Sequence, residues 1–274
     1  MENEPLQKKG IMKIGFFDSG MGGLTILSAV RKLMPQYDYI YFGDTKNLPY
    51  GDKSEEEIQE LTYIGIKRLF DAGSAIVIVA CNTASAESVR KHQDGMLTKE
   101  YPDRKLLGVI VPTVEELVHS SAQNALLVAT ERTIHSKKYE IEIAKLEQGK
   151  VHFTLQTLAT PLLVPMIEAG NIENACEQLS QLLDTNYKNI DTVIFGCTHY
   201  TLLKDTLRAQ SNRTFISQDE IIPEKLQLYL SRHPEIENRL SQEGSVEVTL
   251  SAQKESYEPF LKTLNFRPSE ENLI

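Results

Sequence analysis

The chain has 274 residues, of which 41% are hydrophobic and 24% are charged, and its formal net charge at pH 7 is −9. This length can bury the core of one large domain or of two modest ones. Basic residues form no long run, which argues against a nucleic-acid binder, and no apolar run approaches the roughly 20 residues of a membrane span. The polar start does not resemble a signal peptide, and three cysteines are too few for a disulfide framework, so we expect free thiols and a cytoplasmic location.

Short apolar runs alternate with amphipathic segments from residue 13 to about residue 226. The runs predict strands buried on both faces, over Lys13–Phe17, Asp38–Phe42, Ala75–Ala80, Leu107–Val111, Ala125–Ala129, Val151–Leu158, Thr192–Phe195 and Thr214–Ile216. Helices are expected over Leu24–Leu33, Ser54–Ala72, Ala84–His92, Thr113–Ala122, Ser136–Leu146 and Asn174–Leu183, and Ser54 with Glu57 fits a capping box. The more polar tail adds a strand at Val246–Leu250 and a helix at Tyr257–Leu264. The alternation predicts an α/β protein with mostly parallel sheets flanked by helices.

Two segments share one plan: an apolar strand, a small residue, a cysteine, and then small polar residues. The first contains Cys81 and the second contains Cys197. The distance between them suits equivalent positions in two similar α/β halves. Because ligands gather at the carboxyl ends of parallel strands, we expect both thiols to face one cleft between the halves.

A lone cysteine at the end of a strand is more often a buried apolar residue than a reactive one. Here Asn82 and Thr83 place an amide and a hydroxyl beside the free N–H groups of a helix start, an environment that stabilises thiolate and binds carboxylate. Thr198 and His199 repeat the arrangement after the second cysteine and add an imidazole. Two coincident arrangements favour chemistry over core packing.

Several chemistries could use a cysteine, and the spacing separates them. The pair does not form C-x-x-C, which argues against a redox dithiol, and no third ligand stands at zinc spacing. Catalysis by one nucleophile needs one thiol only. Two opposed thiols fit two-base proton transfer, and the reference pKa of about 8.5 lets thiol and thiolate coexist near neutral pH after modest tuning. Cys176 lacks such surroundings and is interpreted as a core residue.

The first strand ends in a glycine-rich turn that begins with Asp18 and Ser19. Neither G-x-G-x-x-G nor a Walker lysine is present, so the turn does not indicate a nucleotide site. Residues at this position point into a ligand site. Asp18 could accept a hydrogen bond from a substrate ammonium group or assist Cys81.

Three other candidates have ordinary explanations when each is taken alone. Tyr50 and Gly51 belong to a Pro-Tyr-Gly turn, and Glu168 is typical of a solvated helix residue. His199 could be a structural histidine, although its place directly after Cys197 and Thr198 favours a role in tuning that thiol.

As a group, the motifs resemble those of the aspartate/glutamate racemase superfamily, and of glutamate racemases in particular. The matching stretches occur in family order and are DSGMGGLT (18–25), PYG (49–51), ACNTAS (80–85), GVIVP (108–112), ATERTIHSKKY (129–139), LVPMIEAG (163–170) and GCTHYTLL (196–203). They span roughly residues 13 to 216. The GCTHY segment is similar to glutamate racemases, whereas aspartate racemases more often have GCTE.

The resemblance implies that the enzyme interconverts L-glutamate and D-glutamate with no cofactor and no metal, and supplies D-glutamate for peptidoglycan. By position, the catalytic residues would be Cys81 and Cys197, assisted by Asp18, Glu168 and His199. The substrate site would be lined by Asp18, Ser19, Tyr50, Gly51, Asn82, Thr83, Thr198 and His199, with Thr130 and Thr133 as weaker candidates for a carboxylate. We expect Asp18 to serve Cys81, and His199 with Glu168 to serve Cys197.

The resemblance also implies two similar α/β domains with the active site in the cleft between them. The first would combine residues 12–108 with 215–274 and the second would span 109–214, after a disordered extension at 1–11. We expect a homodimer, no nucleic-acid or membrane partner, and in some family members an activator that is a peptidoglycan precursor. The sequence departs from the family pattern at Thr201, where proline is common, and at Ser217-Gln218, where Asp-Ser is common. The second departure could alter the domain hinge or the oligomer contacts.

Two rival functions remain at this point. One is a racemase for another substrate, such as aspartate. The other is a non-catalytic amino-acid-binding regulator, against which the two retained cysteines argue, since binding alone needs neither.

Overall fold

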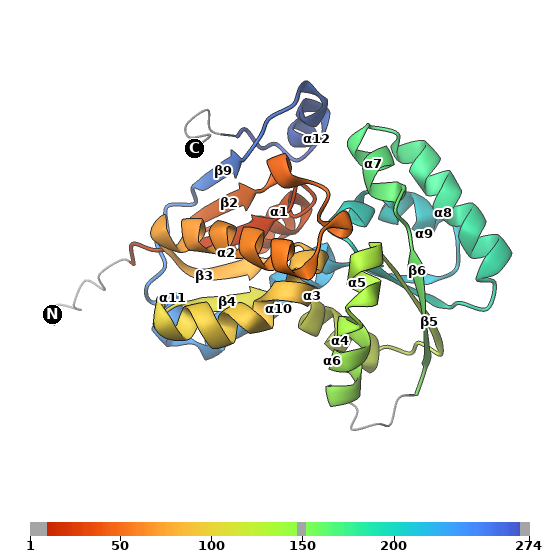
Figure 1. Ribbon diagram of the computed structural model, residues 1–274, viewed down its shortest axis with the longest axis horizontal. Helices are drawn as coiled ribbons and strands as arrows, with labels where there is room; N and C mark the ends of the chain where they lie inside the picture. The colour runs from red at the N-terminus through yellow and green to blue at the C-terminus, as the bar shows by residue number, and fades with distance from the viewer. Residues whose placement is uncertain (1–9, 147–151, 269–274) are drawn as a thin grey trace, which may run out of the picture.

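The structure is a computed structural model that describes residues 10–146 and 152–268. Two parallel sheets lie side by side (Figure 1). The five-stranded sheet contains β1 (Lys13–Asp18), β2 (Tyr39–Gly43), β3 (Ser74–Val79), β4 (Lys105–Gly108) and β9 (Val246–Leu250). The four-stranded sheet contains β5 (Asn124–Ala129), β6 (Thr154–Ala159), β7 (Thr192–Gly196) and β8 (Thr214–Ile216). The predicted α/β class with parallel sheets is confirmed, whereas most of the predicted extension at 1–11 lies outside the described residues.

The two sheets have the same topology. The spatial order is β4-β3-β1-β2-β9 in one and β6-β5-β7-β8 in the other. In both, the first strand of the unit lies between the second and the third, and the fourth lies outside the third; β9 then extends the first sheet beside β2. The chain therefore reverses its direction of winding between β1 and β3, and again between β5 and β7. Such switch points open a crevice at the carboxyl ends of the strands.

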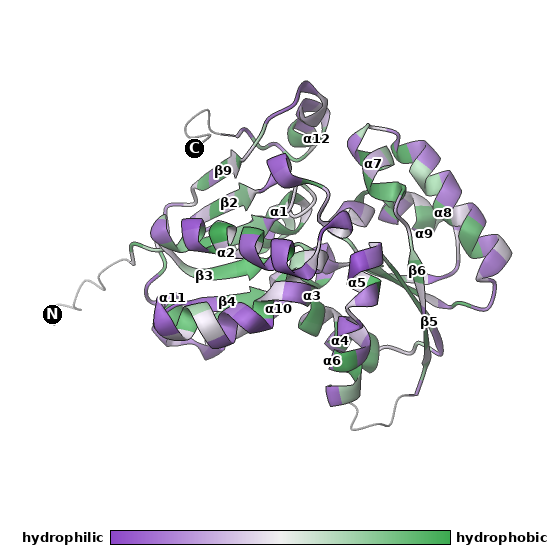
Figure 2. Cartoon of the chain, viewed as in Figure 1, coloured by the Kyte–Doolittle hydropathy of each residue, from purple (hydrophilic) through white to green (hydrophobic). Residues whose placement is uncertain are grey.

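Helices cover the sheets and turn their apolar faces inward (Figure 2). Those before β5 are α1 (Leu24–Leu33), α2 (Glu55–Asp71), α3 (Asn82–His92) and α4 (Ile110–His119). Those that follow up to β8 are α5 (Glu131–His135), α6 (Lys138–Leu146), α7 (Leu163–Glu168), α8 (Ile172–Asn186) and α9 (Lys204–Gln210), and the last are α10 (Gln218–Arg232), α11 (Pro234–Glu237) and α12 (Glu258–Thr263). The predicted capping box of α2 is confirmed, with reciprocal bonds between Ser54 and Glu57.

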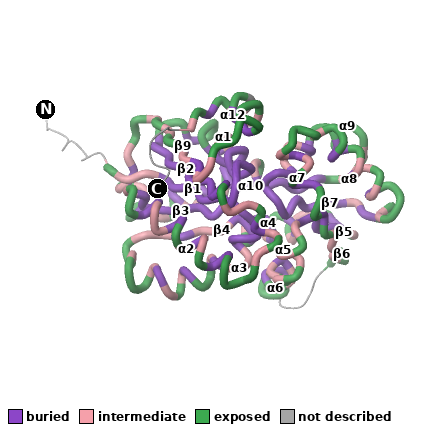
Figure 3. The backbone as a smooth tube through the Cα atoms, turned by 45° about the horizontal axis from the view of Figure 1, so that its top comes forward, coloured by how far each residue is buried: buried purple, intermediate pink, exposed green. Residues whose placement is uncertain are grey.

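The strands β1, β2, β3, β5 and β7 are buried along nearly their whole length (Figure 3), because helices cover both of their faces. The edge strands β6 and β9 are partly exposed, and no residue of β6 is buried, so the double burial expected for the strand over Val151–Leu158 is wrong. Successive side chains of a strand point to opposite faces. Ile14 and Phe16 of β1 accordingly join the apolar cluster under α1 and α10, whereas Phe17 joins the cluster under α2 and α3. This double burial explains the continuous apolar runs in the sequence.

Most predicted boundaries are shifted by one to three residues, and several short helices were not predicted. One shifted boundary and one missed helix have a clear physical cause. The strand expected over Leu107–Val111 ends at Gly108, and Ile110 already belongs to α4. One apolar run crosses from strand into helix here, and hydrophobicity alone cannot locate such a junction. The helix α10 was missing from the expectations because Pro223 interrupts its sequence as a helix breaker would, although the structure accommodates it within the second turn.

The division into domains at 12–108 with 215–274, and 109–214, stays a prediction. The strand pairing is compatible with this division, because β9, near the end of the chain, pairs with β2 of the first sheet, and β8 is the last strand of the second sheet. The connection between them begins at Ser217, directly after β8.

The contact between α2 and β1 yields a test of the packing. A Cβ added at Gly65 would lie 2.1 Å from the ring of Phe17, which is fully buried. We expect Gly65→Ala to lower the free energy of unfolding by about 1–3 kcal/mol, the usual cost of overpacking, despite the better helix propensity of alanine. Chemical denaturation measures this.

The matched control is Gly95→Ala, because a Cβ at Gly95 would meet nothing within 4 Å. We expect its stability to be unchanged or slightly higher. Equal stability of the two variants would contradict the packing described here.

Candidate active site

Both predicted cysteines lie at the carboxyl end of the third strand of their sheet. Cys81 follows β3 and caps α3, and Cys197 follows β7 and precedes a 3-10 helix, η4 (Thr198–Leu203). Both side chains line one cavity, which confirms that the topology brings the two segments together. The predicted internal similarity therefore has a physical basis in the repeated strand order.

Cys81 is almost fully buried and receives two hydrogen bonds. The hydroxyl of Ser19 donates to its sulfur over 3.2 Å, and the N–H of Ala84 donates over 3.4 Å. Burial, and then the nearby charge of Asp18, raise the pKa of Cys81 to about 12, because both disfavour a thiolate. At neutral pH this residue is therefore a protonated thiol, the form that can deliver a proton.

Cys197 has a different partner, the imidazole of His199. The sulfur lies 3.7 Å from Nδ1, and Nε2 lies 3.1 Å from a carboxylate oxygen of Glu168. Burial disfavours the imidazolium, but the hydrogen bonds to Cys197 and Glu168 outweigh it and raise the pKa of His199 well above its ordinary value. The second thiol therefore lies beside a buried cation, whereas the first lies beside a carboxyl group.

Asp18 ends β1 and is completely buried. One carboxylate oxygen accepts the N–H groups of Gly20 and Gly23, each at 3.2 Å, and Tyr41 donates its hydroxyl over 3.4 Å. Burial raises the pKa of Asp18, while the charge of His199 and the turn N–H groups oppose that rise. A side chain at position 23 would crowd Asp18, since a Cβ added at Gly23 would lie 3.0 Å from the Cβ of Asp18. The glycine-rich turn therefore serves to wrap this carboxyl group.

The cavity between the thiols has a volume of about 30 Å³. Ligand pockets usually measure roughly 300–1,000 Å³, so the cavity in this conformation is too small to hold a substrate. Eight of the predicted site residues line it: Ser19, Cys81, Asn82, Thr83, Thr130, Cys197, Thr198 and His199. Leu48, Val164 and Gly196 also line it and were not predicted, because apolar or small residues carry no chemical signal in a sequence.

The other predicted residues lie behind this wall. Asp18 acts on the lining residue Cys81 through its charge, and Glu168 contacts the lining residue His199. Thr133 bonds to the hydroxyls of Thr83 and Thr130 at 3.2 and 2.9 Å. Tyr50 is turned away, since its hydroxyl donates to Asp44 over 2.8 Å.

Gly51 is likewise absent from the cavity wall and faces Thr130 across the two halves, where an added Cβ would lie 3.3 Å from that side chain. For Tyr50 and Gly51, contact with substrate therefore requires a movement of the turn that carries them.

The two departures from the family pattern contact each other. The hydroxyls of Thr201 and Ser217 are 3.3 Å apart, so the segment after Cys197 touches the connection that leads into α10. The neighbouring Gln218 is buried and bonds to Asn82, directly after Cys81. Neither interaction could be read from the sequence, because the partners are far apart along the chain.

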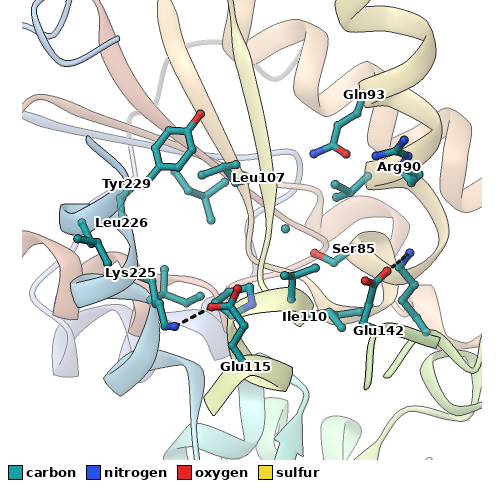
Figure 4. Close-up of a pocket in the computed structure, with 18 of the residues that line it drawn as sticks. Ser85, Arg90, Gln93, Leu107, Ile110, Glu115, Glu142, Lys225, Leu226 and Tyr229 are labelled. Carbon is teal, nitrogen blue, oxygen red and sulfur yellow. Dashed lines mark hydrogen bonds and ion pairs between the residues drawn. The ribbon is translucent and has the colours of Figure 1, made fainter. Parts of the chain in front are cut away.

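A separate pocket of about 530 Å³ is lined by residues of α3, α4, α6 and α10, with Ser85 of α3 among them (Figure 4). Its walls combine apolar side chains such as Leu107 and Ile110 with charged ones. The cationic lining residues are Arg90, Lys138, Lys145, Lys225 and Arg232, and the acidic ones are Glu115 and Glu142. Glu115 pairs with Lys225 at 2.7 Å across the pocket.

In residues 10–146 and 152–268, no group of three or more His, Cys, Asp or Glu side chains could hold a metal ion. None of the helices in the same ranges combines the length and apolar content that crossing a bilayer requires.

Two parallel sheets that each present a buried thiol to one cavity define an α/β racemase. Comparison with known proteins agrees: the family model described as Asp/Glu/Hydantoin racemase matches residues 25–222, and the chain belongs to this family. A glutamate racemase from Caulobacter sp. (strain K31) is 39% identical over 251 residues, covering 82% of this chain and 88% of that protein.

Solved structures agree as well. Glutamate racemase isoform RacE1 from Bacillus anthracis superposes with a TM-score of 0.80 at 26% identity, covering 94% of this chain and 96% of that one. The glutamate racemase from Francisella tularensis, determined in complex with D-glutamate, gives 0.79 at 27% identity, with 94% and 95% covered.

The raised pKa of His199 can be tested directly. We expect its imidazole to remain protonated above pH 7, and Glu168→Gln to lower its pKa because the variant removes one of the two groups that stabilise the cation. NMR titration of protein labelled at histidine measures both values, with His199→Asn to assign the signal.

The exposed His119 and His135 serve as internal controls whose titration should not change. A wild-type His199 that is neutral at pH 7 would contradict the charge arrangement proposed for Cys197.

Proposed function

We propose that the enzyme interconverts L-glutamate and D-glutamate by two-base proton transfer between Cys81 and Cys197, without a cofactor. The observation that carries the proposal is that both thiols line one small cavity, each from a different sheet. An α-carbon held between them would present one face to each sulfur. Glutamate as the substrate rests on the relatives, which are glutamate racemases, and on the structure of one of them with D-glutamate.

The proposed reaction needs one thiolate and one thiol at its start. The thiolate takes the α-proton and becomes a thiol, the electron pair of the C–H bond stays on the substrate, and the opposite thiol gives its proton to the other face. We assign the starting thiol to Cys81, whose pKa is raised, and the starting base to Cys197, whose sulfur lies 3.7 Å from the imidazole of His199. In the reverse direction the two roles exchange.

Negative charge on the substrate during this step needs hydrogen-bond donors. The first turn of α3 offers free N–H groups at the cavity, next to Asn82 and Thr83, and Thr198 faces them from the other sheet. The hydroxyls of Thr83, Thr130 and Thr133 form a cluster with separations of 2.9 to 3.2 Å. We assign the binding of substrate carboxylates to these two groups of donors.

The assisting residues divide between the thiols. We propose that Asp18 acts on Cys81 through its charge, and that Glu168 holds His199 in the orientation that serves Cys197. The effect of Asp18 on the pKa of Cys81 and the two bonds of His199 support this division. In this division, the charge of Asp18 acts on Cys81, and the imidazole of His199 acts on Cys197.

The proposal extends to the cellular role of the enzyme, its assembly and its regulation. A cytoplasmic location and the supply of D-glutamate for peptidoglycan are part of the proposal, and the homodimer stays a prediction. Activation by a peptidoglycan precursor also stays a prediction. The pocket of about 530 Å³ suits an anionic effector, since five lysine and arginine side chains but only two glutamates line it.

The proposal predicts activity with the purified protein alone. We expect the optical rotation of an L-glutamate solution to decay to zero, while L-aspartate remains unchanged. Cys81→Ser and Cys197→Ser should each lower the rate by at least about 10²-fold, the smaller end of the contribution of a general acid or base.

Cys176→Ser is the matched control, because this third cysteine lies in α8 and does not line the cavity. It should keep nearly full activity. Decay with aspartate alone would transfer the proposal to the rival substrate, and full activity in Cys81→Ser or Cys197→Ser would refute the two-base mechanism.

A further inference from the structure

The side chains of Asn82 and Gln218 form a reciprocal pair of hydrogen bonds. The Gln218 amide donates to the Asn82 carbonyl oxygen over 2.7 Å, and the Asn82 amide donates to the Gln218 carbonyl oxygen over 2.8 Å. Both residues are 2% exposed. Asn82 is the first residue of α3 and follows Cys81, whereas Gln218 is the first residue of α10. The pair therefore ties the start of one helix to the start of the other.

A third side chain completes the cluster. Tyr139 of α6, which is 1% exposed, donates its hydroxyl to the same Asn82 oxygen over 2.8 Å, and Gln218 reaches that hydroxyl at 3.4 Å. Asn82 thus uses its oxygen twice and one of its two amide hydrogens, and one N–H remains for the cavity that it lines. Buried polar groups hold one another firmly when all of them have partners, so Asn82 has little freedom to turn.

Ser217, the residue before Gln218, contacts the segment that follows Cys197. Ser217 donates its only hydroxyl hydrogen to Asp219 over 2.6 Å, so at 3.3 Å it must accept from Thr201. Thr201 belongs to η4, the 3-10 helix that begins after Cys197 and contains His199. Asp219 also holds the buried Lys204 at 2.6 Å, which follows the same 3-10 helix.

We infer that Gln218 is a positioning residue for the racemase reaction. It fixes Asn82 and the first turn of α3, and with it the Cys81 thiol, while its neighbour Ser217 is anchored to the segment that carries Cys197. Two adjacent residues thereby set the relative position of the two thiols. The inference rests on the proposed function for its kinetic consequence, but the structural link exists independently of the substrate.

Gln218 does not line the cavity, so it acts through Asn82 and not on the substrate. Misplacing a reacting group by about 1 Å can lower a rate by roughly 10²-fold even when the change is made outside the reacting atoms. Loss of the amide pair should therefore lower kcat more than it raises KM, because the substrate still finds its other donors.

The first experiment measures kcat and KM for glutamate in both directions with Gln218→Met, which keeps the length of the side chain but cannot form either bond. We expect kcat to fall by about 10-fold to 10²-fold. Gln93→Met is the matched control: Gln93 follows the end of α3 that lies opposite Cys81, and its side-chain amide donates to a backbone carbonyl at 2.8 Å. Its kcat should stay within about twofold, since its loss affects only the other end of the helix.

A double-variant cycle then tests whether the effect passes through Asn82. Tyr139→Phe removes the second donor to the same oxygen. Because both residues hold one carboxamide, the combined loss of Gln218→Met and Tyr139→Phe should be smaller than the product of the single losses. Independent, multiplying losses would overturn the inference. Gln218→Glu, which can accept but not donate, provides the same cycle should the methionine variant fail to fold.

A readout without substrate keeps the inference testable whether or not the proposed function holds. Alkylation of Cys81 by iodoacetamide, followed by mass spectrometry of the peptides, should be severalfold faster in Gln218→Met, while the buried Cys176 in α8 should react at its wild-type rate. Equal acceleration of both cysteines would indicate general loosening and would overturn the inference, as would an unchanged rate at Cys81. Wild-type protein that does not racemise glutamate would instead refute the proposed function, independently of this result.

Discussion

Two acid–base groups on opposite sides of a carbon can remove a proton from one face and deliver another to the opposite face, and the site must be shielded from water for both steps. No single strand end can supply both. The repeated strand order solves this problem, because each sheet has a switch point at the carboxyl ends of its strands and each switch point carries one thiol. The glycine-rich turn around Asp18, the carboxamide of Asn82 and the 3-10 helix after Cys197 all follow from the need to place these sulfurs.

The two thiols occupy equivalent positions in the fold but different electrostatic surroundings. Cys81 lies beside a buried carboxyl group and Cys197 beside an imidazole that is itself held by Glu168. A protein that must use one thiol as acid and the other as base benefits from such an asymmetry, since the environment assigns the protons before the substrate arrives. The cavity between the thiols is small, and a site closed in this way keeps water from the reacting atoms.

The sequence was most informative where the residues that form a strand and the residues that carry its chemistry are neighbours in the chain. The apolar runs predicted the parallel strands, and the small polar residues after Cys81 and Cys197 predicted their place at the strand ends, because both signals lie within a few consecutive residues. The role of Gln218 could not be predicted, since its partner Asn82 is distant in the sequence and meets it only in the folded chain. The expectation that Tyr50 lines the substrate site rests on the family resemblance and stays a prediction; in the structure its hydroxyl donates to Asp44.

The central claim is that two different groups handle the proton, and the isotopic content of the first product tests it most directly. When L-glutamate is converted in D₂O, a two-base enzyme removes protium with one thiol and delivers deuterium with the other. The account predicts that the earliest D-glutamate carries deuterium at the α-carbon, while the remaining L-glutamate still carries protium. Early D-glutamate that retains the original α-hydrogen would mean that one group carries the proton across, and would contradict the account.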